Sequence, residues 1–316
     1  MKALVTGGAG FIGSHVTEAL CRRGAKVIVL DNLAGGKLDN LAWRKTGDDV
    51  EFVEDDVRKE TLLRRLLPGC DLVLHHAALP SVPASVAQPL KSNAENLEAT
   101  LGLLVAARDA RIKRFLFASS SAIYGDDETS PKHERLPADP LSPYALQKFA
   151  AEKYAQLFCR LYGLETVSLR YFNIFGPRQS FDSPYSGVIA RFCTAMLRSE
   201  PPVIFGDGKQ SRDFTYIDNV VAANLLALEA PPGKVAGKVF NIACGESITL
   251  LDLGQELNRL TGQRLEPKFQ PARVGDVRTS RADIAAAQRE LGYQVKVNWQ
   301  EGLKRTLDFY RAELPA

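Results

Sequence analysis

A glycine-rich segment, Gly7-Gly8-Ala9-Gly10-Phe11-Ile12-Gly13, places the strongest constraint on the fold of this chain. It follows a short apolar run at residues 2–6, which predicts a buried strand, and it leads into an amphipathic stretch, which predicts a helix to about Arg23. Glycines at this spacing permit a tight turn at Gly7, close approach of a ligand to the backbone at Gly10, and close helix–strand packing at Gly13. The N-terminus of the predicted helix is a favourable place for phosphate groups.

A second predicted strand, residues 26–30, ends at Asp31, which lies 18 positions after Gly13. A carboxylate at this place can accept hydrogen bonds from an adenosine ribose. Strand, glycine turn, helix and a strand that ends in an acid together predict a dinucleotide site. Asp31 would also repel a 2′-phosphate, and Asn32 rather than an arginine follows it, so the sequence favours NAD over NADP.

The chain continues as an alternation of strands and helices up to about residue 171. Strands are predicted at 51–54, 72–75, 115–119 and 165–169, and helices at 58–67, 88–110 and from Pro143 to about Tyr162. This order predicts an α/β fold with a Rossmann-type, doubly wound parallel sheet and helices on both faces. Ligands of such sheets bind beyond the carboxyl ends of the strands, where this chain has Asp56-Val57, His75–Ala78 and Ser119–Ser121.

Tyr144 and Lys148 lie one helical turn apart on the predicted helix that Ser142 and Pro143 begin. An ammonium group beside a phenol favours the phenolate. The pKa of tyrosine, about 10, would have to fall by roughly three units for the side chain to act as a base near neutral pH. A tyrosine and a lysine at this spacing also occur on ordinary solvated helices. The catalytic interpretation of the pair therefore depends on the other motifs of the chain.

The regular alternation ends after about residue 172. Helices are predicted at 187–198, 219–229, 250–260, 282–291 and 299–311, and strands at 202–205 and 239–242. We expect a dinucleotide-binding domain over residues 1–171 and a smaller, partly interleaved substrate domain over residues 172–316. Residues of about 215–243 are expected to return to the first domain.

Composition excludes several classes of partner. Hydrophobic residues make up 45% of the chain and charged residues 24%, and the net charge is only +3 with both signs interspersed. We therefore expect no nucleic-acid and no membrane partner. The five cysteines are scattered and form no metal-binding pattern, which favours a reduced, cytoplasmic chain without a structural metal.

The motifs together resemble the extended short-chain dehydrogenase/reductase family, in its nucleotide-sugar epimerase branch. The resemblance covers essentially the whole chain. It is carried by Thr6–Gly13, Asp31-Asn32, Asp56-Val57, His75–Ala78, Asn96–Thr100, Ser119–Gly125, Tyr144 with Lys148, Arg170–Asn173, Ser211–Asp213 and Arg273–Asp276.

The resemblance implies a role for each matching residue. Tyr144 would be the base, Lys148 would lower its pKa and hold the nicotinamide ribose, and Ser120 would link the substrate hydroxyl to Tyr144. The expected NAD contacts are Gly7, Gly10, Phe11, Ile12, Gly13, Asp31, Asn32, Asp56, Val57, Ala77, Ala78, Asn96, Tyr144 and Lys148. The expected contacts to a UDP-sugar are Ser81, Ser120, Ser121, Tyr144, Asn173, Gly187, Val188, Val203, Phe205, Arg212, Arg273, Asp276 and Ser280.

The implied reaction is 4-epimerisation of a UDP-hexose through a transient 4-keto sugar, in a homodimer built on the helices near 92–110 and 144–162. Pro80-Ser81-Val82-Pro83 stands where some hexose epimerases carry a lysine, and this resembles the subgroup acting on N-acetylated or uronic sugars. UDP-glucuronate 4-epimerase therefore stays open. A dehydratase or decarboxylase is disfavoured because Ser121-Ala122 replace the acidic residues of those relatives. A non-catalytic NAD-binding protein is disfavoured because Tyr144 and Lys148 are both present.

Overall fold

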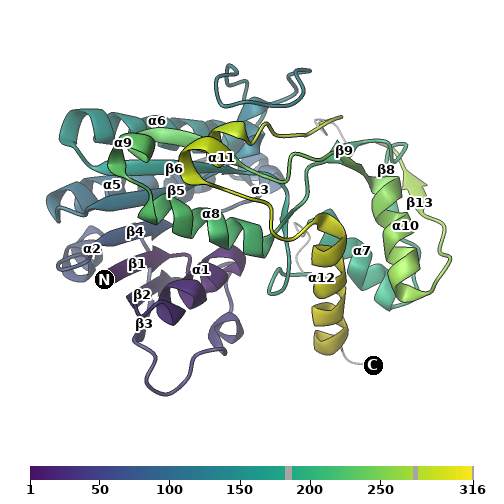
Figure 1. Ribbon diagram of the computed structural model, residues 1–316, viewed down its shortest axis with the longest axis horizontal. Coiled ribbons are helices and arrows are strands. Elements are labelled where there is room, and N and C mark those ends of the chain that lie inside the picture. Colours follow the sequence, from purple (N-terminus) through teal and green to yellow (C-terminus); the bar gives the residue numbers. More distant parts are fainter. Residues whose placement is uncertain (182–186, 273–276, 315–316) are drawn as a thin grey trace.

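The computed structural model describes residues 1–181, 187–272 and 277–314, and a seven-stranded sheet forms its centre (Figure 1). Every pair of neighbouring strands in this sheet is parallel. In spatial order the strands are β11 (Lys238–Ile242), β6 (Glu165–Tyr171), β5 (Arg114–Ser120), β4 (Leu72–His75), β1 (Lys2–Thr6), β2 (Lys26–Asp31) and β3 (Val50–Glu54). This confirms the Rossmann-type, doubly wound sheet that the alternating pattern predicts.

Helices cover both faces of the sheet because successive side chains of a strand point in opposite directions. In β1, Ala3 and Val5 pack toward α1 and α8, whereas Leu4 packs toward α2, α5 and α6. The bounds of these helices are α1 (Phe11–Arg22), α2 (Glu60–Leu66), α5 (Ala99–Asp109), α6 (Pro143–Tyr162) and α8 (Ile217–Glu229). The sheet is thus buried on both sides, as parallel sheets are.

A smaller lobe lies beyond one end of the sheet (Figure 1). Its helices are α7 (Val188–Leu197), α10 (Leu250–Thr261) and α12 (Trp299–Glu313). Its short strands pair as β8 (Val203–Phe205) with β13 (Lys268–Gln270) and β9 (Ser211–Arg212) with β12 (Ile248–Thr249), and β7 (Ile174–Phe175) with β10 (Thr215–Tyr216) joins it to the sheet. The remaining helices are α3 (Val82–Ala87), α4 (Pro89–Asn93), α9 (Pro232–Val235) and α11 (Ala285–Leu291).

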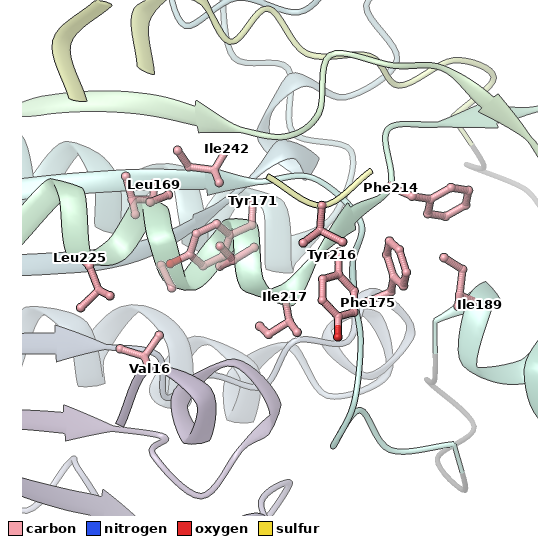
Figure 2. Packing of buried hydrophobic residues seen from close by; sticks show 14 of the residues in the cluster. Val16, Leu169, Tyr171, Phe175, Ile189, Phe214, Tyr216, Ile217, Leu225 and Ile242 are labelled. Atoms are coloured by element: carbon pink, nitrogen blue, oxygen red, sulfur yellow. The ribbon is translucent and has the colours of Figure 1, made fainter. Parts of the chain in front are cut away.

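One hydrophobic core runs from the sheet into the smaller lobe. Figure 2 shows Leu169 and Ile242 from the sheet in the same cluster as Phe175, Phe214 and Ile189 from the lobe. The chain also returns from the lobe to the sheet, because β11 pairs with β6 over its full length. The two parts therefore share their packing.

The helix predicted over residues 88–110 is interrupted. It consists of α4, a π-helical turn at Ala94–Glu98 and α5. Such turns insert an extra residue into a helix and occur often at functional sites. Among the described residues, no helix is both long and apolar enough to cross a membrane.

Candidate active site

The glycine turn between β1 and α1 leaves no room for side chains at three of its glycines, Gly7, Gly8 and Gly13. Gly7 has a φ of +67°, and a Cβ there would lie 2.6 Å from the backbone nitrogen of Ala77. A Cβ at Gly13 would lie 2.1 Å from the carbonyl oxygen of Gly7. A Cβ at Gly10 would meet only that same oxygen, at 3.1 Å. The backbone at Gly10 is therefore open on its outer side, beside the N-terminus of α1.

Asp31 holds this turn from the neighbouring strand. Its carboxylate accepts hydrogen bonds from the backbone N–H of Ala9 (3.0 Å) and of Leu33 (2.8 Å). Each of its oxygens keeps acceptor capacity for a further donor. Phe11 and Ile12 begin α1 beside the turn and are half-buried.

Asp56 and Asn32 come together at the ends of β3 and β2. Arg58 donates to the Asp56 carboxylate through its backbone N–H (2.8 Å) and its guanidinium (2.9 and 2.6 Å). These bonds, with a smaller contribution from Asn32, lower the pKa of Asp56 to about 2. Val57 lies next to this carboxylate and is half-buried. The predicted adenosine side of the site is thus assembled from two strand ends.

These observations fit a dinucleotide. The open backbone at Gly10 and the start of α1 suit a pyrophosphate, and Asp31 suits a ribose hydroxyl pair. Among the described residues, no group of three or more His, Cys, Asp and Glu side chains could hold a metal ion.

Asn96 is engaged within the protein. Its Oδ1 accepts from the backbone N–H of Leu79 (2.7 Å), and its Nδ2 donates to Oε1 of Gln147 (2.8 Å). Asn96 thereby fixes the segment that follows β4, where Ala77 lies against the glycine turn. The predicted direct contact of Asn96 with NAD stays a prediction, and the structure adds this positioning role.

The predicted catalytic residues meet at the end of β5. Ser120 is the last residue of that strand, and its hydroxyl accepts the N–H of Ala122 (3.2 Å) to cap the short 3₁₀ turn at Ser121–Tyr124. Tyr144 lies in the first turn of α6, where the Ser142 hydroxyl accepts from the N–H of Ala145 (3.2 Å). The Lys148 ammonium donates to the carbonyl oxygen of Ala118 (2.8 Å).

Burial shifts the pKa values of both Lys148 and Tyr144. Lys148 is buried, with 5% of its surface exposed, and burial lowers its pKa to about 7. Burial also raises the pKa of Tyr144, and a hydrogen bond with Ser120 opposes that shift. In the chain by itself, burial is the largest effect on both groups. The role of Lys148 in lowering the pKa of Tyr144, together with a cationic nicotinamide ring, stays a prediction.

The predicted sugar-nucleotide residues are distributed over the smaller lobe and its border. Val203 is 40% exposed and Phe205 is half-buried, while Ile204 between them points into the core. Arg212 donates to the carbonyl oxygen of Val277 (2.6 Å), and the N–H of Ser280 donates to the carbonyl oxygen of Ser211 (3.1 Å).

Other predicted substrate residues have visible structural roles. Asn173 has a φ of +36°, a conformation that side chains rarely adopt, and such strain is common at functional sites. Gly187 and Val188 begin α7. Ser81 is buried and caps α3, accepting from the N–H of Ala84 (3.1 Å), and Ser121 begins the 3₁₀ turn. Arg273 and Asp276 lie outside the described residues.

Asp213 is an organising residue, and its place in a motif was the only role predicted for it. It is fully buried, and its carboxylate accepts the N–H groups of Cys244 (2.9 Å), Gly245 (3.0 Å) and Ala282 (3.0 Å). Burial raises its pKa to about 6 despite these bonds. Asp213 thus joins the segment that follows β11 to Ala282. Its neighbours in the sequence, Arg212 and Phe214, give no signal for this role.

A dinucleotide-type glycine turn combined with a serine, a tyrosine and a lysine at the end of β5 defines a protein of the short-chain dehydrogenase/reductase class. The chain belongs to the NAD dependent epimerase/dehydratase family, whose model matches residues 3–243.

Solved structures of high similarity cover nearly the whole chain. UDP-glucose 4-epimerase from Thermotoga maritima, solved with UDP-glucose, is 41% identical with a TM-score of 0.94 and covers 100% of both chains. UDP-N-acetylglucosamine 4-epimerase from Methanobrevibacter ruminantium, in complex with UDP-N-acetylmuramic acid, is 39% identical with a TM-score of 0.94 and covers 99% of both. UDP-glucuronic acid 4-epimerase from Bacillus cereus, with UDP-glucuronic acid and NAD, is 32% identical with a TM-score of 0.92, covering 99% of this chain and 100% of that one.

Proposed function

We propose that this chain is a UDP-hexose 4-epimerase that retains NAD, interconverting UDP-GlcNAc with UDP-GalNAc and also UDP-Glc with UDP-Gal. The observation that carries the proposal is the meeting of Tyr144, Lys148 and Ser120 at the carboxyl end of β5, at the same edge of the sheet as the glycine turn. The names of similar proteins support the reaction class.

Each of the three residues has a distinct task. Tyr144 takes the proton of the sugar 4-hydroxyl and later returns a proton to the same oxygen. Ser120 hydrogen-bonds to the tyrosine and to the substrate hydroxyl, which holds the two oxygens in line. Lys148 is held by the Ala118 carbonyl and would bind the nicotinamide ribose. The 4-keto sugar must rotate in the pocket between the two proton transfers. The protein therefore has to bind the UDP group tightly and the sugar weakly.

The glycine turn, Asp31, Asp56 and Lys148 are the residues that would hold NAD. When bound, NAD would supply a reversible two-electron oxidation at the sugar C4 and a cationic ring that favours the phenolate of Tyr144. No net redox change results, because the oxidation is reversed within each turnover.

The UDP group is assigned to the smaller lobe. Val203 and Phe205 share one side of β8 and are suited to frame the uracil ring. Arg212 and Arg273 have the planar, permanently charged group that suits phosphate oxygens. Nη1 of Arg212 donates to the carbonyl oxygen of Val277, which fixes one end of its guanidinium.

The choice of sugar is assigned to Ser280. By resemblance this position forms the wall of the sugar pocket, where a tyrosine stands in relatives restricted to plain hexoses. Ser280 is joined to β9, the strand that carries Arg212, through its bond to Ser211. A small side chain there leaves room for a 2-acetamido group to turn with the sugar. Gly187, at the start of α7, would add space on another side.

The test is incubation of the purified protein with single UDP-sugars, followed by separation of the products. We expect conversion within both the N-acetyl pair and the plain pair, and turnover reduced by at least about 10²-fold in Tyr144→Phe. Absence of conversion of every UDP-hexose would contradict the proposed function.

The Ser280→Tyr variant tests whether Ser280 is the gate that determines which sugars fit the pocket. We expect this variant to lose the N-acetyl activity selectively while it keeps activity on UDP-Glc and UDP-Gal. Equal loss on both pairs, or no N-acetyl activity in the parent, would rule out Ser280 as the gate.

UDP-glucuronate is the second candidate substrate, because a UDP-glucuronic acid 4-epimerase aligns with 99% of this chain. Including UDP-glucuronate in the same panel decides between the two. Preferential conversion of the uronic sugar would replace the N-acetyl assignment and retain the catalytic residues.

A further inference from the structure

We propose that Glu152 and Arg170 form a positioning pair that sets the catalytic face of α6 against the end of β5. The inference rests on the proposed function, because it takes Tyr144 as the base. It concerns two residues that touch none of the reacting atoms.

Three residues of α6 at successive four-residue intervals meet three successive residues of β5. Lys148 donates to the carbonyl oxygen of Ala118 (2.8 Å), and Tyr144 shares a hydrogen bond with Ser120. Between these contacts on the strand, the Ser119 hydroxyl donates to Oε2 of Glu152 (2.9 Å). Residues spaced in this way form one stripe on a helix, so Glu152 continues the catalytic stripe by one turn.

Glu152 also forms a two-point ion pair with Arg170 of β6. Arg170 donates to both oxygens of Glu152, through Nε (2.9 Å) and through Nη2 (2.7 Å). Such two-point pairs fix orientation as well as distance. Glu152 is fully buried and Arg170 is 3% exposed, so water does not weaken the pair.

The pair is also tied to the strands that carry the site. Ser119 is opposite Arg170 in the pairing of β5 with β6, and Ser120 is opposite Tyr171. The Arg170 guanidinium lies 4.8 Å from the centre of the Tyr124 ring, at the end of the turn that begins after Ser120. Glu152 thus connects α6 to both strands one residue away from Ser120, and a shift of α6 would move Tyr144 along the strand.

The same strands carry a matched control at their other end. Arg114 is opposite Glu165 in β5 and β6, and its guanidinium donates to Oε2 of Glu165 (3.1 and 2.7 Å). Arg114 is buried, with 5% of its surface exposed. This ion pair joins the same two strands far from Ser120. It is less buried than the first pair, because the Glu165 side chain is 32% exposed and only its Oε2 accepts.

The experiment compares steady-state kinetics and melting temperature for NAD-loaded parent, Glu152→Gln, Ser119→Ala, Glu165→Gln and the double variant Glu152→Leu/Arg170→Met. For Glu152→Gln we expect kcat to fall about tenfold or more, since a small misplacement of a catalytic group costs this much, while KM changes little. Ser119→Ala should lower kcat less, again at constant KM. Glu165→Gln should lower the melting temperature without lowering kcat.

The double variant separates positioning from stability. Replacing both members of a buried ion pair by apolar residues often restores stability. We expect its melting temperature to recover while kcat stays low. The inference is overturned if kcat recovers with the melting temperature, if Glu165→Gln loses as much kcat as Glu152→Gln, or if Ser119→Ala and Glu152→Gln both match the parent. An active Tyr144→Phe variant would instead overturn the proposed function.

Discussion

Lys148 and Tyr144 are the residues at which burial matters most. In water each side chain would have its usual pKa. In the folded chain, desolvation lowers the pKa of Lys148 to about 7 and raises that of Tyr144. In the chain alone, burial therefore shifts the balance of both side chains toward their neutral forms. A positive charge brought in by a ligand shifts that balance toward the phenolate. This arrangement would keep the base inactive until the site is filled.

The first prediction concerns the proton acceptor. Tyr144→Phe removes the phenol oxygen and keeps the ring, so we expect NAD to be retained and turnover to fall by at least about 10²-fold, the usual scale for a lost acid–base group. Ser120→Ala should have a milder effect. Bound NAD is measured from denatured protein, and turnover from the UDP-sugar assay. A Tyr144→Phe variant that turns over like the parent would show that the base lies elsewhere.

The second prediction concerns Lys148 and pH. Its pKa is about 7 in the folded chain and 10.5 in the ordinary side chain, so above pH 7 the unfolded state binds one more proton than the folded state. Stability then rises with pH from about 7 toward 10, by up to about 1.4 kcal/mol per unit. Lys148→Met should remove this slope in cofactor-free protein. If the free energy of unfolding depends on pH in the same way in the parent and in Lys148→Met, the lowered pKa of Lys148 is contradicted.

At the scale of elements, the sequence predicts the parts of the fold that follow a regular period. The strands of the sheet, α1 and α6 follow from apolar runs, glycines and a Ser-Pro start. The interruption of the 88–110 helix by a π-helical turn is missed, because the side chain of Asn96 forms its bonds with distant residues. The two-residue strands β7, β9, β10 and β12 are missed because they are too short to show alternation.

The same contrast holds within the site. Its backbone features could be predicted, because the glycine turn and Asp31 depend on local geometry. The pKa values of Lys148 and Tyr144 could not, because they depend on how many atoms from other elements surround each group.

The third prediction tests the glycine turn as an element. A Cβ at Gly13 would lie 2.1 Å from the Gly7 carbonyl oxygen, so Gly13→Ala must push α1 away from the turn. We expect loss of retained NAD and a lower melting temperature. The control is Gly254→Ala in the interior of α10, where a Cβ meets nothing within 4 Å. That change should stabilise the protein by about 0.5–1 kcal/mol. Retention of NAD by Gly13→Ala would contradict the role of the turn.

At the scale of the whole molecule, we propose a homodimer that uses α5 and α6. Leu146, Tyr154 and Leu161 of α6 expose 55%, 37% and 62% of their surfaces, and their spacing places them on one face of the helix. Arg108 of α5 lies over the ring of Tyr162, 5.0 Å from its centre, and aligns the two helices. The fourth prediction is that the parent sediments as a dimer and that Leu161→Glu weakens the association. A monomeric parent at micromolar concentration would contradict it.

The return of the chain to β11 also has a consequence for synthesis. Seventy-one residues separate the end of β6 from the end of β11, the strand that completes the sheet. At the usual rate of about 5–20 residues per second, the ribosome needs roughly 4 to 14 s to supply them. During that interval β6 is an open edge in a nascent chain, able to pair with any extended segment nearby. Because the core also crosses into the smaller lobe, a ribosome that stalls in this window would release a fragment prone to aggregation rather than an independent dinucleotide-binding unit.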